Sequence, residues 1–466
     1  MITLTPRNIV LSFIFISFLL VFQSITKGNE DDFVRDRKSL IKLYNTQAYS
    51  EIIEQFKNYE WAEVKNPYEM ILYCFALSET DTSPDSIFKS SDFPKHMIEF
   101  CSAYVSLMKG NTKYADKTFK DLATKEKFES LGYIGLLEQS IYTENFSSMA
   151  SNLDKLKLLK QTKSEVLDWA IPFYSLIYHY KMANFDEAEN IFNLYKNKEK
   201  WFNDLVVSIK INILLRTNKF EEAKNVLNKA FEIYGMTEEL ILAESNIIYL
   251  EKGADISSTY LKERISKFSK MWKLKQQFVF HLLETDQKDT HSKAASIMKE
   301  ISDIRRHDVL NIILTIDTLM DLGFYDDAGK MLHLLNKQAK QLTDFTSYNI
   351  LMAKMDFSAG MITSLQKNLD IALRMSPMES YILWFQYGVA EETNTDKEAL
   401  DAIHRLLHLD PYNQAALTSL AKNYYENKQW GKIKLVADKL LKSPRHKNSK
   451  LVQEMEGYVK VASKMK

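Results

Sequence analysis

Hydrophobic residues recur with a helical period along most of this chain, in runs that are separated by short polar turns. The clearest turns share one phrase: a small or polar residue, then an aromatic residue, then an alanine that opens the next run. This phrase occurs at 184–188, 218–223 and 323–328. Ala188 and Ala223 lie 35 residues apart, and Ala328 follows after 105 more, which is three further steps of 35. A repeat of this length with two amphipathic runs predicts stacked helix–turn–helix pairs, each covering the apolar face of the next.

Turns divide residues 33–444 into about twelve such pairs. They begin near Asn45, Asp81, Gly110, Glu144, Asn184, Asn218, Gly253, Asp286, Gly323, Gly360, Asn394 and Asn427. The whole chain has 12 Gly and 8 Pro, too few for a turn-rich β protein, and 45 % hydrophobic residues exclude global disorder. The predicted fold is therefore all-α, a solenoid of helix pairs rather than one very large core.

Charge is balanced over the chain but not along it. Lys and Arg number 61, as do Asp and Glu, so no overall charge recruits nucleic acid, and none is expected as a partner. Residues 428–466 are the exception, with 11 Lys and Arg against three acidic residues. Such a terminal segment is typical of a helix that covers the last pair with a soluble outer face. The alternative is contact with an acidic partner or with lipid headgroups.

The first 28 residues stand apart from the repeats. Residues 9–22 form a run of 14 without a charge. At about 1.5 Å per residue such a helix spans ~21 Å, less than a ~30 Å bilayer core, which favours a cleaved signal peptide. If Ser24 to Thr26 extend the run, residues 9–26 become a signal anchor, and a buried helix is the third alternative. We expect an exported protein, in the periplasm or cell envelope or anchored to the cytoplasmic membrane, with membrane contact only through this segment.

The last unit, Tyr412 to Pro444, carries the residues of a known family. Leu420 and Ala421 supply a large–small pair, and an aromatic residue follows at Tyr424. Prolines close successive units at 377, 411 and 444, at intervals of 34 and 33, and Trp384, Tyr387 and Gly388 occupy the corresponding positions one unit earlier. This pattern resembles the tetratricopeptide repeat (TPR). The resemblance is strongest over 346–444, whereas over 33–345 only the spacing of the repeat is kept. Residues 445–466 are expected to form a basic capping helix.

What the resemblance implies is a right-handed superhelix in which each position has a structural task. Small residues let neighbouring helices approach closely, and prolines end the second helices. The positions concerned are Ala188, Ala223, Ala328, Gly388 and Ala421, the aromatic Tyr424, and Pro377, Pro411 and Pro444.

The chain shows few residues that could carry out chemistry. No three closely spaced glycines form a phosphate loop, and no serine lies in a nucleophile elbow. His404 and His408 have the spacing of a two-histidine metal site, but they lack the glutamate of the HExxH arrangement. We therefore expect no catalytic residue, no metal, no cofactor and no enzymatic activity. Cys74 and Cys101 are interpreted as two buried thiols, with a disulfide between neighbouring helices as the alternative.

Function is accordingly inferred from shape. In proteins similar to this one, first helices line a groove that holds a peptide or a partner's helix. Polar residues of the first helices recur here at intervals of 34 or 35; they are Asn212, Asn246, His281, Thr315 and Asn349. They form a candidate partner-binding ladder, or they merely share the repeat period. We expect a non-enzymatic scaffold of the cell envelope. The alternatives are an accessory subunit of a polysaccharide export or modification system, and a eukaryotic endomembrane adaptor.

Overall fold

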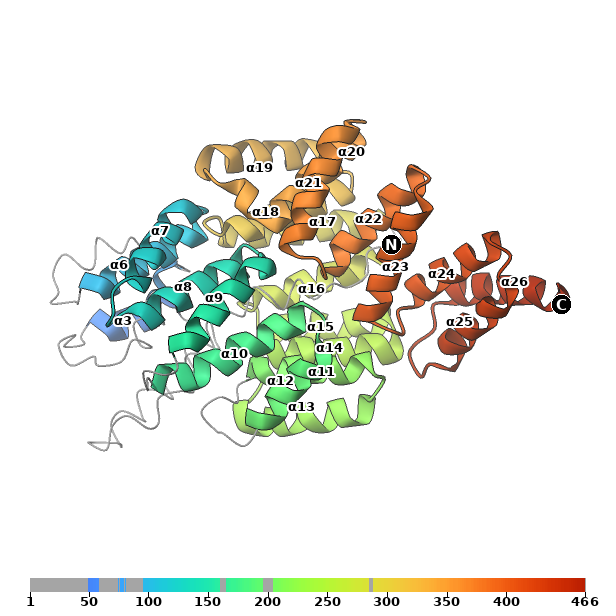
Figure 1. Ribbon diagram of the computed structural model, residues 1–466, viewed down its shortest axis with the longest axis horizontal. Coiled ribbons are helices and arrows are strands. Elements are labelled where there is room, and N and C mark those ends of the chain that lie inside the picture. Colours follow the sequence, from blue (N-terminus) through green and yellow to red (C-terminus); the bar gives the residue numbers. More distant parts are fainter. Residues whose placement is uncertain are drawn as a thin grey trace.

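The computed structural model describes residues 49–57, 74, 76–78, 80, 95–159, 165–195, 204–284 and 288–465. Across this part of the chain the regular structure is helical and contains no strand, so the all-α prediction is confirmed (Figure 1). The signal-peptide or anchor prediction for residues 1–28 lies outside the described residues. So does most of the first two predicted pairs, from which α3 (Tyr49–Lys57) and a few residues around Cys74 are described.

Ten complete helix pairs follow one another within the described residues, and where the turn is described it falls at the predicted place. They are α6 (Lys95–Met108) and α7 (Thr112–Ala123); α8 (Glu129–Tyr142) and α9 (Phe146–Leu158); α10 (Glu165–Lys181) and α11 (Phe185–Tyr195); α12 (Asp204–Arg216) and α13 (Phe220–Tyr234); α14 (Glu238–Lys252) and α15 (Ala254–Lys267); α16 (Trp272–Leu283) and α17 (Lys288–Ile304); α18 (Val309–Asp321) and α19 (Tyr325–Gln338); α20 (Thr346–Ser358) and α21 (Ile362–Met375); α22 (Ser380–Glu392) and α23 (Asp396–Leu409); α24 (Gln414–Glu426) and α25 (Trp430–Lys442). A short 3₁₀ turn, η4 (Leu342–Asp344), precedes α20, and α26 (Ser449–Lys464) ends the stack.

Most turns inside the pairs share one backbone geometry. After α6, the Gly110 N–H donates to the Leu107 carbonyl and the Asn111 N–H to the Ser106 carbonyl, both at 2.9 Å, which is a Schellman motif. The motif needs a left-handed residue, and φ lies between 54° and 82° at eight equivalent positions. These are Gly110, Glu144, Ala183, Asn218, Gly323, Gly360, Asn394 and Lys428. Side chains other than glycine cost about 1 kcal/mol in this conformation, so their neighbours must hold the turn in place.

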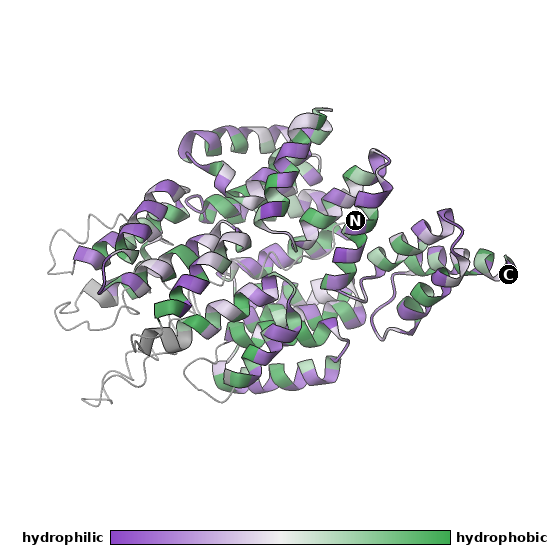
Figure 2. Ribbon diagram, viewed as in Figure 1, coloured by the Kyte–Doolittle hydropathy of each residue, from purple (hydrophilic) through white to green (hydrophobic). Residues whose placement is uncertain are grey.

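The two helices of a pair are buried to different extents. In α18, 11 of 13 residues are buried, whereas α19 buries only Ala328, Leu332 and Leu335 among its 14. In this pair the first helix is therefore enclosed on most sides, whereas the second helix presents an outer face to solvent. The colouring of Figure 2 follows this, with hydrophobic segments gathered where helices meet.

Most of the residues assigned to the repeat pattern lie where stacked helix pairs need them, with the alanines buried and the prolines just after second helices. Ala188, Ala223 and Ala421 are fully buried and Ala328 is 2 % exposed. Tyr424 packs against the core around Leu420. Pro377, Pro411 and Pro444 each stand two residues after the end of a second helix, α21, α23 and α25 respectively.

Gly388 is a correction to the sequence analysis. It is exposed, and a Cβ placed there would meet no atom within 4 Å, so it does not allow a close helix approach. The reason is a register error of one residue. Ala421 is the eighth residue after the cap Asn413, and the eighth after the equivalent cap Glu379 is Tyr387.

Cys74 and Cys101 are joined as a disulfide, with their Cα atoms 4.9 Å apart and both residues fully buried. The interpretation of Cys74 and Cys101 as two separate buried thiols is therefore wrong, and the alternative, a disulfide between neighbouring helices, is what the structure has. The bond ties the second predicted unit to α6.

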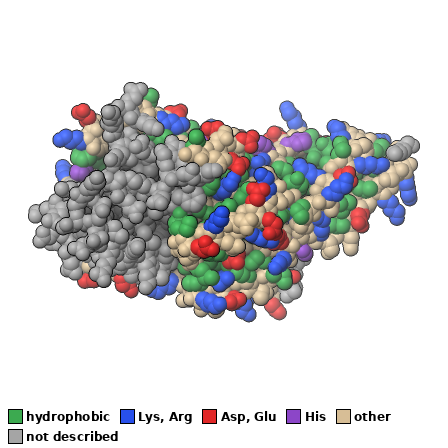
Figure 3. Space-filling view, turned by 90° about the horizontal axis from the view of Figure 1, so that it is seen from below, with side chains coloured by type: hydrophobic (Ala, Val, Ile, Leu, Met, Phe, Trp, Pro, Cys, Tyr) green, Lys and Arg blue, Asp and Glu red, His purple; other side chains and the backbone are tan. Residues whose placement is uncertain are grey.

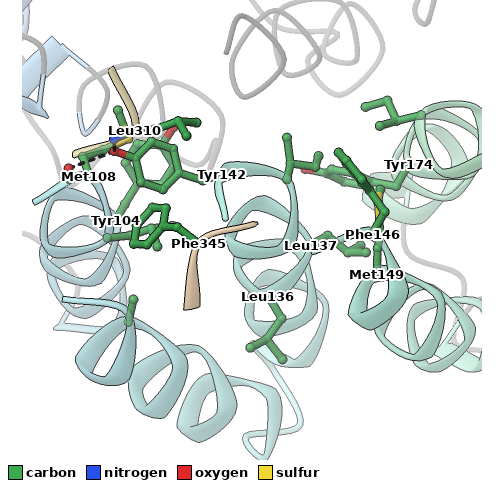
Figure 4. Packing of buried hydrophobic residues seen from close by; sticks show 14 of the residues in the cluster. Tyr104, Met108, Leu136, Leu137, Tyr142, Phe146, Met149, Tyr174, Leu310 and Phe345 are labelled. Atoms are coloured by element: carbon green, nitrogen blue, oxygen red, sulfur yellow. Dashed lines mark hydrogen bonds between the residues drawn. The ribbon is translucent and has the colours of Figure 1, made fainter. Parts of the chain in front are cut away.

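Helix pairs that are far apart in the sequence also contact one another, and we call this line of contacts the inter-turn seam. The Tyr142 hydroxyl of α8 lies 2.9 Å from the carbonyl of Met108 and 2.8 Å from the carboxylate of Asp308, at the start of α18, and its single proton faces these two acceptors. Its ring lies edge-on to Phe345, with centroids 5.6 Å apart (Figure 4). A hydroxyl thus links two pairs that are 166 residues apart in the chain.

The first five of these ten pairs, in succession, each meet a part of the chain about six pairs further on, the fifth meeting the linker between α25 and α26. The contacts run from Thr112 to Asp344, from Glu144 to Ser347 and Ser376, from Lys181 to Glu379, from Asn218 to Ser443, and from Leu250 to His446. The stack therefore returns onto itself after six pairs, and successive superhelical turns touch.

Candidate partner-binding groove

The predicted ladder of polar residues does not form one open line. His281 and Thr315 are fully buried and Asn349 is 1 % exposed, while Asn212 and Asn246 are half-buried. The Thr315 hydroxyl donates to the Asn311 carbonyl at 2.9 Å, and the Asn349 amide donates to the carbonyl of Phe345 at 2.8 Å.

His281 pairs with Gln277 at 3.0 Å in the same helix, α16, and burial lowers its pKa to about 3. The partner-binding expectation is thus corrected for His281, Thr315 and Asn349, because enclosed first helices use these groups internally. For Asn212 and Asn246 it stays a prediction.

Ionic groups at the starts of first helices are also used internally. The Arg305 guanidinium donates to the Asp308 carboxylate at 2.7 Å and lies over the Trp272 ring at 4.4 Å. Asp308 in turn caps α18 by accepting from the Asn311 N–H. Burial, with the Asp308 carboxylate beside it, raises the pKa of Tyr142, which keeps this hydroxyl protonated as a donor.

The seam is held by buried charged groups as well as by apolar contact. Lys181 and Glu379 form an ion pair at 2.9 Å, with both side chains 2 % exposed. Glu144, a left-handed residue that is 1 % exposed, accepts from Ser347 through its carboxylate and from Thr346, at 2.9 Å, through its carbonyl. These contacts hold a strained turn in place and fix the spacing between superhelical turns.

Arg445 fastens the end of the chain to the seam. Its guanidinium donates to Asp410 at 2.6 Å, to the Asn218 side chain at 2.7 Å and to the Leu215 carbonyl at 2.9 Å. The residue is 5 % exposed, so it belongs to a buried clamp, and the capping helix proper is α26.

A groove on the outer side of the molecule lies between two successive second helices, α21 and α23. It has a volume of about 920 Å³ and is lined by Ile362, Thr363, Gln366, Lys367, Asp370, Leu373, Arg374 and Arg405. We call this the α21–α23 groove. Its lining residues in α21 run from Ile362 to Arg374, a length of about 18 Å at 1.5 Å per residue.

Positive charge dominates this groove. Lys367, Arg374 and Arg405 line it together with one carboxylate, Asp370. The side-chain amide of Gln366 donates to that carboxylate at 2.8 Å. Leu373, half-buried, and Ile362, 54 % exposed, supply apolar surface between the cations.

One end of the groove, where α21 finishes, is fixed by hydrogen bonds. Arg405 donates to the carbonyl of Pro377, and its other nitrogen lies 3.4 Å from Asp401. The Ser147 hydroxyl, at the start of α9 in the neighbouring superhelical turn, donates to the Arg374 carbonyl at 2.5 Å. The seam therefore holds the backbone of α21 where the groove ends.

The sequence analysis did not find this groove, because it sought partner residues in first helices. The available signal was the spacing of Lys367, Asp370 and Arg374, which places three charges on one face of a second helix. His408 of the suspected two-histidine pair lies in the seam, 3.2 Å from the Ala183 carbonyl. Within the described ranges no group of three or more His, Cys, Asp or Glu side chains could hold a metal ion.

A stack of helix pairs that each present this turn and this enclosed first helix has the architecture that the sequence resemblance implied. The chain has a TPR-like fold of stacked helix pairs. No family model matches it, and no curated protein matches it. None of the helices that the structure describes is long and apolar enough to cross a membrane.

Two solved structures show a distant likeness to this chain. The crystal structure of the APC/C hetero-tetramer Cut9–Hcn1 matches at a TM-score of 0.43 and 12 % identity, over 80 % of this chain and 72 % of that chain. A monomeric mutant of IFIT1 with Gppp-AAAA matches at a TM-score of 0.32 and 14 % identity, over 84 % of this chain and 95 % of that chain. Likenesses this distant carry no inference about what the TPR-like chain binds.

Proposed function

We propose that this TPR-like protein is a non-enzymatic scaffold that binds an acidic segment of a partner protein in the α21–α23 groove. The observation that carries this is the grouping of Lys367, Arg374 and Arg405 around the apolar Leu373, in an open groove. Carboxylates of a partner would pair with the guanidinium and ammonium groups, and an apolar side chain between them would cover Leu373.

The dimensions define the ligand. An extended chain rises about 3.3 Å per residue, so a groove of about 18 Å accepts five or six residues of an extended segment. Arg405 is already positioned by the Pro377 carbonyl, which lowers the entropic cost of using it. Because the groove is open, salt should weaken binding.

A fluorescein-labelled hexapeptide of alternating Glu and Leu is a direct probe, with the same peptide carrying Lys in place of Glu as its negative control. We expect saturable anisotropy binding to the full chain. The double substitution Lys367→Glu with Arg374→Glu should weaken it at least about tenfold, roughly 1.4 kcal/mol. The matched control reverses two exposed lysines of α7, Lys113→Glu with Lys117→Glu, and should leave it unchanged.

The proposal fails if both charge-reversed proteins bind the acidic peptide as the unchanged protein does. It also fails if the Lys peptide binds equally well, since the interaction would then not depend on charge. Circular dichroism of each variant establishes that the helices are intact before binding is compared.

We further propose that this scaffold acts outside the cytoplasm, assembling components of the cell envelope. The uncharged run at 9–22 supports export, and the disulfide between Cys74 and Cys101 suits an oxidising compartment. Removal of residues 1–28 should retain the protein in the cytoplasm in a fractionation experiment. An unchanged distribution would contradict the export proposal and leave the groove proposal standing.

A further inference from the structure

The second helix of the last pair, α25, has a basic outer face with an exposed leucine in its middle. In α25, Lys432, Leu435, Lys439 and Lys442 follow one another at intervals of three or four residues, so they lie along one side of the helix. Leu435 is 72 % exposed, and the three lysines are exposed as well. We call these four residues the basic C-terminal face.

The neighbouring helix α26 also carries more exposed lysines than carboxylates. Exposed Lys450, Lys460 and Lys464 of α26 stand against Glu454 and Glu456. On α25 itself the opposing carboxylate is Asp438, which pairs with Lys442 at 2.9 Å. The four residues of the face and these neighbours carry six lysines and three acids, a net charge of +3.

The shape of the region points to a flat partner. Figure 1 shows α24, α25 and α26 projecting from the rest of the molecule, and Figure 3 shows Lys and Arg side chains at this end. The basic C-terminal face is one side of a single helix, α25, in this projecting part of the molecule. A peptide therefore finds no enclosure there, whereas an extended anionic plane reaches every lysine and the exposed leucine at once.

We propose that the basic C-terminal face docks on an anionic lipid surface. The lysines lie at the headgroups and Leu435 enters the interface between headgroups and acyl chains. This site is independent of the α21–α23 groove and of residues 1–28. It would add a second membrane contact to the one expected of the N-terminal segment.

Vesicle co-sedimentation of the full chain tests the proposal. The readout is the ratio of its partitioning into phosphatidylcholine vesicles with 30 % phosphatidylglycerol to that into pure phosphatidylcholine. This ratio separates charge-driven docking from any apolar binding by residues 9–26. We expect a ratio well above one at low salt that falls with added salt, because screening acts on the lysines.

Two substitutions locate the site. Lys432→Glu with Lys439→Glu should lower the ratio at least about 25-fold, at about fivefold for each lysine lost near an anionic surface. Leu435→Ser should lower partitioning into anionic vesicles about fivefold at both low and high salt. The reversals in α7, Lys113→Glu with Lys117→Glu, are the charge-matched control and should have no effect.

Two results would overturn the proposal. One is a ratio near one, or a ratio that the α25 reversals leave unchanged. The other is soluble polyglutamate binding that the α25 reversals abolish while vesicles do not bind, which would assign the face to an acidic protein. The groove variant Lys367→Glu with Arg374→Glu should keep the vesicle ratio of the unchanged protein, so failure of either proposal is visible separately.

Discussion

The ion pair between Lys181 and Glu379 tests whether the seam stabilises the molecule. Lys181 ends α10 and Glu379 caps α22, six pairs apart in the stack, and both side chains are 2 % exposed with 2.9 Å between Nζ and Oε1. Glu379→Gln keeps the shape but leaves the ammonium of Lys181 buried beside a neutral amide. Removing one partner of a buried pair costs about 3–5 kcal/mol, because the remaining charge has lost its compensation.

The structure supplies a control with the same distance and the opposite exposure. Lys442 and Asp438 also lie 2.9 Å apart, but their side chains are 77 % and 64 % exposed. Asp438→Asn should therefore cost no more than about 1 kcal/mol. The double substitution Lys181→Met with Glu379→Leu removes both charges and should fall within about 2 kcal/mol of the unchanged protein.

Amide hydrogen exchange is the appropriate assay, because it reports opening free energies segment by segment in a long stack that need not unfold in one step. For Glu379→Gln we expect the loss of protection to concentrate in α10 and α22, with α15 little changed. The reasoning is refuted if this variant loses no more stability than Asp438→Asn. It is refuted equally if the double replacement costs as much as the single one.

Three further predictions concern packing, turn geometry and pH. Ala223→Glu places a carboxylate in a fully buried site and should lower the free energy of unfolding by at least about 3 kcal/mol, while exposed Lys229→Ala should change it by less than about 0.5 kcal/mol. Lys428→Gly removes a side chain at φ +56° and Gly360→Ala adds one at φ +70°, so urea unfolding should shift by about 1 kcal/mol in opposite directions. Burial lowers the pKa of His281 to about 3, so the folded protein keeps this side chain neutral at pH 5, whereas the unfolded chain binds a proton there below about pH 6.5. The free energy of unfolding should therefore fall by about 2 kcal/mol between pH 7 and pH 5. His281→Gln should lack that part of the loss, and equal pH slopes in the two proteins would contradict the assignment.

The succession of helices was predictable because its signals are local. A turn such as that at Gly323 combines a left-handed residue with an aromatic residue and an alanine, all within six positions. The amphipathic period of each run then sets which face packs. The positions of Pro377, Pro411 and Pro444 were predictable for the same reason, since a proline disfavours helix continuation, although Pro172 lies inside α10.

The seam and the groove could not be predicted in this way, because they depend on the superhelical pitch. The contact of Glu144 with Ser347 crosses 203 residues, and no local pattern marks either residue as a partner of the other. The same pitch decides that Asn349 is enclosed. The role of Gly388 was predicted wrongly for a simpler reason. Tyr387 occupies the position that Ala421 occupies in the next unit, so the alignment of the sequence motif was wrong by one residue.

The seam also determines where a partner can reach this molecule. First helices are enclosed, and the inner polar residues that a more open superhelix would expose are partly used within the chain. Second helices keep their outer faces, so a groove between two of them is accessible while the turns remain in contact. Because Ser147 of one turn holds the Arg374 carbonyl of the next, the end of the α21–α23 groove keeps its shape only while the seam is closed. Under the groove proposal, peptide binding and closure of the superhelix are linked: a ligand that needs the closed groove stabilises the seam, and opening of the seam weakens ligand binding by the same free energy.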